Sequence, residues 1–313
     1  MADTSIEWCD VVWNPTSGCD RVSDGCTNCY ALTMAKRLKA MGAPGYQRDG
    51  NPATSGPGFR LTLHSDKLTV PLHWRRPRRI FVNSMSDLFH ADVPDDYIAK
   101  VFAVMAATPQ HTYQILTKRH ARMRNLLSNG QWRDSTFEPA VDELVPGLAF
   151  EHPWPLPNVW MGVSVETQQW ADIRIPALLQ TPAAVHFLSC EPLLGPVTLK
   201  PEWVEPVWPR VDWVIVGGES GPHARPMHPD WVRALRDQCT AAGVAYFVKQ
   251  WGEWAPDGHF AGDPAVLGHN QHAFPGSGDP QFTHTVVRRV GKKAAGRELD
   301  GRTWDQYPQA VTA

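Results

Sequence analysis

Short apolar runs rich in β-branched and aromatic residues recur along the chain and predict strands. Most are nearly continuous rather than alternating, which is typical of strands covered on both faces. The predicted strands are Glu7–Trp13, Arg79–Asn83, Thr112–Thr117, Val159–Val165, Val185–Ser189, Val211–Gly217 and Val244–Lys249.

Helix-length segments with apolar residues three and four apart separate these runs. The predicted helices are Tyr30–Met41, Pro94–Ala107, Gln168–Leu179 and Pro229–Ala242. Successive strands often start about 30 residues apart, the length of a strand–helix–strand unit. This alternation indicates an α/β fold with a parallel sheet, either a closed or partial barrel or a doubly wound sheet.

Two stretches interrupt the alternation, and the chain changes character near its end. Residues 42–72 are rich in Gly, Pro, Ser and Thr, and residues 131–157 carry acidic residues and prolines, so both are interpreted as insertions. The chain becomes polar and glycine-rich from Gly252. We therefore expect a barrel domain over 1–251 and a C-terminal extension over 252–313, packed on or beside the barrel.

Composition narrows the class of protein. The chain has 313 residues of which 42% are hydrophobic, enough for a sizeable core. Its net charge of −2 provides no general attraction for nucleic acid, so such contacts would come from local patches. No apolar run approaches the ~18 residues of a membrane span. The first residues show no secretory leader, so we expect a cytoplasmic protein with no membrane contact.

The six cysteines are unevenly distributed. Cys19, Cys26 and Cys29 fall within the segment Asn14–Tyr30, NPTSGCDRVSDGCTNCY, between the first predicted strand and the first predicted helix. The carboxyl ends of parallel barrel strands are where active sites form. Cys9 and Cys239 are expected in the core, and Cys190 beside Glu191 could reach the mouth of the barrel.

Three interpretations of this cysteine cluster remain open from the residues alone. Zinc would need a fourth ligand, such as Cys9 or a histidine. Buried, unliganded thiols are a second interpretation. The preferred one is an iron–sulfur cluster on three cysteinates, because the remaining iron can then bind a substrate or cofactor.

The cysteine segment resembles that of the radical S-adenosylmethionine (SAM) superfamily, although the spacing here is C-x6-C-x2-C rather than C-x3-C-x2-C. The wider pattern resembles a phage-associated three-cysteine family of unassigned function related to that superfamily. The motifs that carry this resemblance are NPTSGC, GCTNCYA, NSMSDLFH, LTKR, GVSVE, LSCEPLLG, VGGESG and AAGRELDGRTWDQYP.

The resemblance implies a partial (β/α) barrel and a radical SAM-type enzyme. Cys19, Cys26 and Cys29 would hold a 4Fe-4S cluster. Electrons from a reductant such as a flavodoxin or ferredoxin would drive reductive cleavage of SAM to a 5′-deoxyadenosyl radical, which would abstract hydrogen from an unidentified substrate. A partner protein is a further possibility.

Polar residues follow several predicted strands and supply candidate ligands for the cofactor. By the resemblance, Ser86 and Asp87 would hold the amino group of SAM, and Lys118 and Arg119 would bind its carboxylate. Ser164 and Glu166, two apart on an extended segment, would bind the ribose. The alternative interpretations are a turn residue for Asp87 and a solvated charge pair for Lys118 and Arg119.

Candidate substrate contacts follow the later strands. Glu191, Glu219 and Gln250 stand at or just beyond predicted strand ends, where we expect them to contact substrate. The glycine pair before Glu219 is also what a tight turn would need.

A basic segment, His73–Arg79, combines Trp74 with four arginines. Arg75, Arg76, Arg78 and Arg79 could grip phosphates while the indole stacks on a base, so a nucleoside or nucleic-acid substrate is a hypothesis. The alternative is a solvated rim beside a strand. At the level of function, the alternative is a non-enzymatic, zinc-binding nucleic-acid-binding protein of phage or prophage origin.

Overall fold

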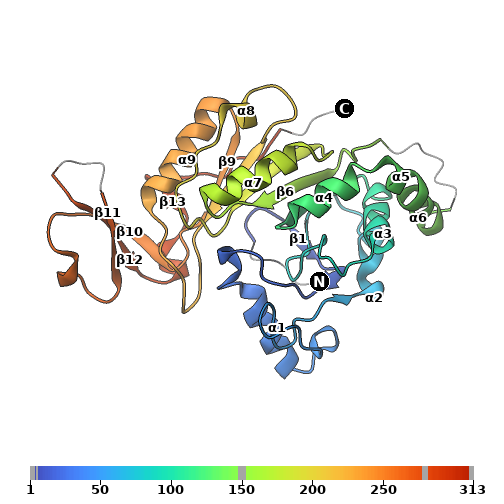
Figure 1. The fold of residues 1–313 in the computed structure, drawn as a ribbon, viewed down its shortest axis with the longest axis horizontal. Helices are drawn as coiled ribbons and strands as arrows, with labels where there is room; N and C mark the ends of the chain where they lie inside the picture. The colour runs from blue at the N-terminus through green and yellow to red at the C-terminus, as the bar shows by residue number, and fades with distance from the viewer. Residues whose placement is uncertain (1–3, 5, 147–152, 277–280, 310–313) are drawn as a thin grey trace. The chain divides into compact units, whose positions relative to one another are not determined.

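The computed structural model describes residue 4 and residues 6–146, 153–276 and 281–309. Its principal element is a sheet of seven strands whose spatial order follows the chain, β1-β4-β5-β6-β7-β8-β9 (Figure 1). The recorded pairs β1–β4, β4–β5, β5–β6 and β8–β9 are all parallel. The predicted α/β partial barrel of parallel strands is therefore confirmed.

The strands of this sheet are short and deeply buried. They are β1 Val11–Trp13, β4 Arg79–Val82, β5 Thr112–Thr117, β6 Val159–Ser164, β7 Val185–Cys190, β8 Trp213–Gly217 and β9 Ala245–Gln250. Every residue of β6, β7 and β8 is buried, which explains why these strands read as continuous apolar runs. The first strand begins at Val11 rather than Glu7, because the chain turns before it, with the amide of Cys9 donating to the carbonyl of Ile6.

Helices cover the intervals between the strands. The longer ones are α1 Tyr30–Ala40, α3 Asp95–Ala106, α4 His120–Leu127, α7 Gln168–Leu179 and α9 Pro229–Ala242. Helix α9 has the predicted bounds and ends at Gly243, whose φ of 65° suits a left-handed cap. Helix α4 was not predicted, because the basic run from Lys118 obscured the spacing of its buried Met123, Leu126 and Leu127. In the described part of the chain, no helix has the length and apolar character needed to cross a membrane.

The chain divides into two compact units, and the division falls within the sheet. Unit 1 comprises residues 1–164, 173–187 and 309–313, and it contains β1, β4, β5 and β6. Unit 2 comprises residues 165–172 and 188–308, and it contains β8 and β9. Strand β7 is shared between them. Each unit is described below by itself.

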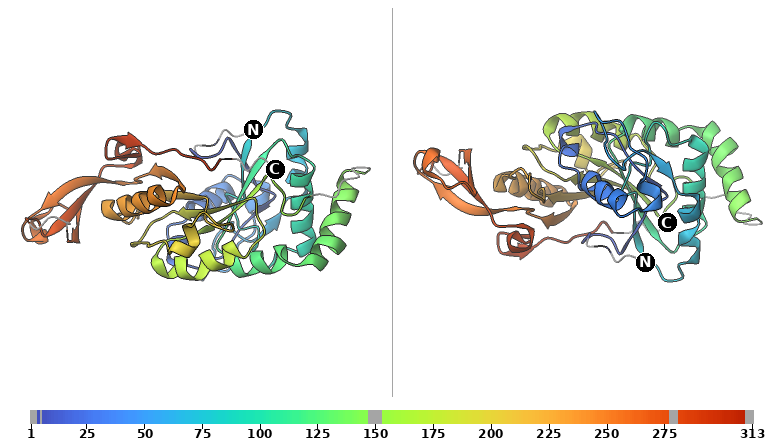
Figure 2. Two further views of the ribbon diagram at one scale, coloured as in Figure 1. Left: turned by 90° about the horizontal axis from the view of Figure 1, so that it is seen from above. Right: turned by 90° about the horizontal axis from the view of Figure 1, so that it is seen from below.

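Both predicted insertions contain local structure in unit 1. Residues 42–72 include β3 Thr62–Leu63, which pairs with β2 Thr16–Ser17, and the short helix α2 Ser65–Leu68. Within 131–157, of which 147–152 lie outside the described residues, α5 Gly130–Trp132 continues through a π-helical turn into α6 Glu138–Leu144. Helix α6 packs beside α3 (Figures 1 and 2).

The C-terminal segment after Gly252 forms structure that its polar composition concealed. Strands β10 Trp254–Phe260, β12 His284–Arg289 and β11 Gln271–Pro275 form an antiparallel sheet, seen as the long orange-red ribbon in Figure 2. Farther along are α10 Lys292–Ala295 and the pair β13 Glu298–Leu299 and β14 Arg302–Thr303. One more short helix, α8 Pro201–Val204, precedes β8. The middle of β10 is exposed, so no apolar run marks it in the sequence.

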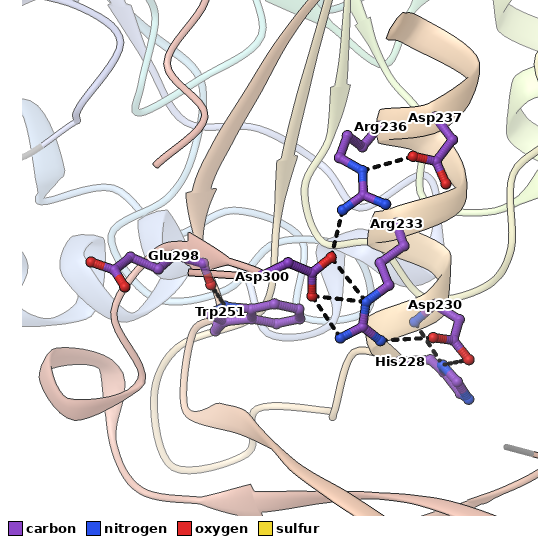
Figure 3. A network of polar contacts seen from close by, with 8 residues as sticks. All are labelled: His228, Asp230, Arg233, Arg236, Asp237, Trp251, Glu298 and Asp300. Carbon is purple, nitrogen blue, oxygen red and sulfur yellow. Dashed lines mark hydrogen bonds and ion pairs between the residues drawn. The ribbon is translucent and has the colours of Figure 1, made fainter. Parts of the chain in front are cut away.

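The end of this segment is fastened to β9 and α9 within unit 2. The amide of Val248 donates to the carbonyl of Trp304 at 2.9 Å, and the Trp251 indole donates to the carbonyl of Glu298 at 2.8 Å. Asp300 accepts from Arg233 Nη2 at 2.9 Å and from Arg236 Nη1 at 2.5 Å (Figure 3). These contacts hold the β13–β14 turn against the surface of α9.

Replacing Asp300 by Asn tests this fastening. The hydrogen bonds from Arg233, followed by those from Arg236, hold the pKa of Asp300 below its usual value. Its contribution is therefore present above the unfolded pKa of about 3.9 and is lost as pH falls through the folded pKa. Asn tolerates the positive φ of 52° at this position. We expect Asp300→Asn to lower the free energy of unfolding at pH 7 by less than about 1 kcal/mol, because the pair is partly exposed.

The measurement is urea unfolding of wild type and variant at pH 7 and at pH 3. The difference between the two proteins should shrink at the lower pH. Asp305→Asn, at an exposed position, is the control and should have little effect at either pH. A difference that persists unchanged at pH 3 would contradict the assignment.

Candidate functional site

The cysteine loop, defined as residues 14–30, runs from the carboxyl end of β1 to the first turn of α1. Its second half is tightly wound: the amide of Cys26 donates to the carbonyl of Ser23 at 2.9 Å, and the amide of Cys29 donates to that of Cys26 at 3.3 Å. Cys29 is the residue that precedes α1. The side chains of Cys19, Cys26 and Cys29 are all half-buried free thiols. The three predicted ligands therefore lie on one loop at the carboxyl end of the first strand.

Gly18 holds the start of this loop between two other segments. Its amide donates to the carbonyl of Met85 at 2.9 Å, which joins it to the loop after β4. Its φ is +92°, and a Cβ here would lie 2.3 Å from the carbonyl oxygen of Arg60 in the insertion. Ser86 strengthens the same junction, because its hydroxyl donates to the carbonyl of Thr16 at 3.0 Å. The predicted cofactor ligand Ser86 thus also has a structural role.

Asp20, next to Cys19, is held by groups from two segments. Its carboxylate accepts from Thr54 Oγ1 at 2.5 Å and contacts His90 Nε2 at 2.8 Å. The Nδ1 atom of His90 accepts from the amide of Asp92, so its Nε2 carries the proton and donates to Asp20. Burial acts to raise the pKa of Asp20, but the hydrogen bonds from Thr54 and His90 hold it below its usual value. Sequence reasoning missed both partners; His90 ends the NSMSDLFH motif.

Asp87 connects the loop after β4 to the end of β5. Only 6% exposed, it accepts from the amide of Phe89 at 3.0 Å, from Thr117 Oγ1 at 2.7 Å and from the amide of Lys118 at 2.9 Å. The bond from Phe89, two residues on, is the turn arrangement considered from sequence. Three donors fill most of the acceptor sites of a carboxylate. A contact between Asp87 and the amino group of SAM stays a prediction.

A cation lies beside the first of the thiols. Arg119 Nη2 donates to Cys19 Sγ at 3.7 Å and to the carbonyl of Asp20 at 3.2 Å. Burial and the charge of Asp87 raise the pKa of Cys19 to about 12, while Arg119 acts in the opposite direction. Burial also raises the pKa of Cys29, and the backbone amides of Ala31 and Leu32 oppose it more than the charge of Lys118 does. Cys26 acts electrostatically on both other thiols, so it contributes to raising the pKa of each.

The donor set can be compared with the two candidate metal groups. Among the described residues, no three His, Cys, Asp or Glu side chains converge closely enough to hold a single metal ion. A 4Fe-4S cluster does not need such convergence, because each cysteinate bonds a different iron. Bound metal also displaces the proton that burial retains on a thiol. The donor set of three thiols is chemically compatible with such a cluster, and the choice between a cluster and zinc stays a prediction.

The predicted ribose ligands are inaccessible in this structure. Ser164 is 2% exposed, and its carbonyl accepts from Arg174 Nη1 at 2.8 Å in unit 1. Glu166, in unit 2, is fully buried, and its carbonyl accepts from the amide of Leu194. A ribose contact by either side chain would require a local opening, and it stays a prediction.

Two of the predicted substrate residues, Glu191 and Gln250, lie at strand ends in unit 2. Glu191 Oε2 lies 2.6 Å from Lys249 Nζ, and a Cβ on Gly217 would lie 3.0 Å from the same oxygen. Gln250 Nε2 donates to the carbonyl of Gly218 at 2.9 Å. Its Oε1 is buried and has no hydrogen-bond partner in the described part of the chain.

Glu219 has a different environment. Its carboxylate accepts from the backbone amide of Arg225 at 2.8 Å, from Arg225 Nε at 3.0 Å and from Nη2 of the same residue. This bidentate ion pair closes the loop after β8. A Cβ on the neighbouring Gly218 would lie 2.1 Å from the carbonyl oxygen of Trp251, so the glycine also meets a packing requirement. Contact between Glu219 and substrate stays a prediction.

The basic segment precedes β4 and so lies at the opposite end of that strand from the loop that joins the cysteines. Arg75 and Arg76 are exposed, and the Arg78 guanidinium stands 5.6 Å from the centre of the Trp74 ring. Arg79 forms an ion pair with Asp10 at 3.2 Å. A nucleic-acid contact here stays a prediction, and in unit 1 it would be separate from the cysteine loop.

The remaining cysteines are all buried. Cys9 is 7% exposed, and Cys190 and Cys239 are fully buried. Burial raises the pKa of Cys190 well above its usual value, with further contributions from neighbouring acidic groups. Cys9 and Cys239 are core residues as predicted, and Cys190 does not reach the surface in this structure.

Replacing Gly18 by Ala tests how the cysteine loop is held. The new methyl group meets backbone, which cannot move aside as a side chain can, and the positive φ adds strain. We expect a loss of about 2–4 kcal/mol in the free energy of unfolding. Gly42→Ala is the matched control: φ there is +74°, but nothing lies within 4 Å of the added Cβ, so about 1 kcal/mol is expected. Equal losses in urea unfolding would show that the contact with Arg60 does not matter.

Comparison with known proteins gives a family match and structural matches that each span most of the chain. Among curated proteins no similar sequence is found. Among solved structures, a cysteine-to-serine mutant of spore photoproduct lyase aligns with 92% of this chain and 71% of its own, at 10% identity and a TM-score of 0.38. Spore photoproduct lyase complexed with dinucleoside spore photoproduct aligns with 88% and 67%, at 9% identity and a TM-score of 0.35. At these scores the likeness assigns no activity to this chain. A family profile matches residues 3–308, and the chain therefore belongs to the family described as protein of unknown function DUF5131.

Proposed function

We propose that this protein is a radical SAM-type iron–sulfur enzyme whose cluster is held by Cys19, Cys26 and Cys29. The observation that carries the proposal is the cysteine loop itself: three free thiols on one loop at the carboxyl end of β1, with the guanidinium group of Arg119 donating to Cys19 Sγ. When bound, a 4Fe-4S cluster with one iron free of protein ligands would supply the electron for reductive cleavage of SAM to a 5′-deoxyadenosyl radical.

The residues around the thiols support this use. Cations beside cysteinates offset the negative charge that a cluster and its ligands introduce into a half-buried loop. Lys118 is fixed through its backbone by Asp87, and its ammonium group is our candidate for the carboxylate of SAM. Ser86 and the rest of the loop after β4 adjoin the cysteine loop through Thr16 and Gly18, so they are candidates for the amino group.

The substrate side of the proposal rests on polar groups at the strand ends of unit 2. Glu191 and Lys249 form an ion pair, and the side-chain oxygen of Gln250 is a buried hydrogen-bond acceptor. Gln250 Nε2 is already bonded to the carbonyl of Gly218, so only its Oε1 would accept from a substrate, and a nucleoside or nucleic-acid substrate stays a hypothesis. Glu219 would act there only if its ion pair with Arg225 opened.

The decisive experiment is anaerobic reconstitution followed by chemistry. Iron, sulfide and zinc are measured on oxygen-free protein, which is then reduced with dithionite in the presence of SAM and assayed by chromatography for 5′-deoxyadenosine. We expect Cys26→Ala to abolish cluster binding and product, because only two cysteinates remain. Cys239→Ala, in the core of α9, is the control and should retain both. Protein that holds one tetrahedral zinc and no iron would overturn the proposal.

Lys118 provides a second test, specific to the cofactor. Replacing it by Met removes one charge-assisted hydrogen bond to a carboxylate, so SAM should bind roughly 10- to 100-fold more weakly. Iron content should stay at the wild-type level. Lys100→Met is the control, because Lys100 lies on α3 and its ammonium group pairs with Glu143 of α6 at 3.5 Å. Affinity is measured by equilibrium dialysis of the reconstituted protein, and an unchanged affinity in Lys118→Met would remove this residue from the SAM site.

A further inference from the structure

We propose that Arg119 is a positioning residue for the cluster rather than a ligand of the SAM carboxylate: its guanidinium group holds Cys19 and raises the reduction potential of the cluster bound there. The inference rests on the proposed function, because it concerns the same thiols. It revises the role that the sequence resemblance implies for Arg119, and it leaves Lys118 as the cation for the cofactor.

The geometry places the guanidinium group on the thiol. Arg119 Nη2 donates to Cys19 Sγ at 3.7 Å and to the adjacent carbonyl of Asp20 at 3.2 Å. The backbone of Arg119 is fixed as well, since its amide donates to Thr117 Oγ1 at 2.8 Å. That hydroxyl donates in turn to Asp87 at 2.7 Å. Hydrogen bonds therefore hold both the backbone and the guanidinium group of Arg119 in place.

Cys19 is held from its other side by contacts that do not involve Arg119. The preceding Gly18 is bonded to Met85, and the following Asp20 is bonded to Thr54 and His90. Both partners of the Arg119–Cys19 contact are thus anchored independently. The contact does not depend on the rotamer of a solvated side chain.

A second donor on Arg119 is available at the same place. Its Nε is buried and has no hydrogen-bond partner among the residues that the structure describes. Nε–H and one Nη2–H lie parallel along one edge of the planar guanidinium group, the edge that grips anions in a bidentate manner. Since Nη2 is directed at Cys19, this edge offers a further donor to an anionic group held by that cysteine.

This arrangement has a consequence for redox chemistry. One-electron reduction makes a cluster more negative, and a fixed cation beside a ligating sulfur stabilises the reduced form. Hydrogen bonds to the sulfurs act in the same direction. Arg119 should therefore raise the reduction potential. Arg122 is bonded to the carbonyl of Val93 and to Asp95, so it does not duplicate this role.

The test is a redox titration of reconstituted protein without SAM, with dithionite as reductant and electron paramagnetic resonance as readout. For Arg119→Met we expect the ratio of reduced to oxidised cluster at a fixed solution potential to fall at least about tenfold, which corresponds to a shift of about 59 mV. Arg119→Lys keeps the charge but loses the planar pair of donors of the guanidinium group, so its ratio of reduced to oxidised cluster should fall about threefold. Arg124→Met is the matched control, because Arg124 lies on α4, which begins directly after Arg119, and it bonds Gln180 and Asn125. Its ratio should equal that of wild type.

Every other outcome either supports or overturns the inference. If Arg119→Met binds a cluster at the wild-type potential but loses affinity for SAM, Arg119 is a carboxylate ligand. If the folded Met variant holds no cluster, the Lys variant decides: a lowered potential supports the inference and a wild-type potential overturns it. If wild-type protein contains no iron and sulfide, the inference fails together with the proposed function, and metal analysis alone reveals this.

Discussion

The buried carboxylate of Asp87 is the interaction on which the candidate site depends. A buried charge is costly unless donors surround it, and here the loop after β4 supplies one donor while the end of β5 supplies two. The donors at the end of β5 are the hydroxyl of Thr117 and the amide of Lys118. The carboxylate therefore fixes the backbone from which the side chains of Lys118 and Arg119 extend. The buried side chain of Asp87 thus positions the two cationic residues of the candidate site.

The segment between α1 and β4 is part of the same construction. From sequence it is an insertion rich in small residues, and in the structure its Thr54 and Arg60 contact the cysteine loop at Asp20 and Gly18. Loops that carry functional residues need a rigid support, and here an irregular segment provides it. Its glycine and serine content reflects close backbone packing and not only freedom of movement.

Much of the fold could be predicted because the sheet strands are buried on both faces. Strand β5 and helices α7 and α9 have the predicted bounds. Helix α4 and the antiparallel sheet β10–β12–β11 were missed. Both carry charged or exposed residues over much of their length, so no apolar pattern marks them in the sequence.

The sequence by itself determined that three thiols share one loop between the first strand and the first helix, because their spacing and the flanking periodicities are local. Only the tertiary structure decided what each polar side chain contacts: Arg119 reaches Cys19, Glu219 pairs with Arg225, and Glu191 pairs with Lys249. It also decided that Glu166 is buried. The physical reason is that hydrogen bonds and ion pairs have short range, so they depend on segments that the chain brings together from distant positions.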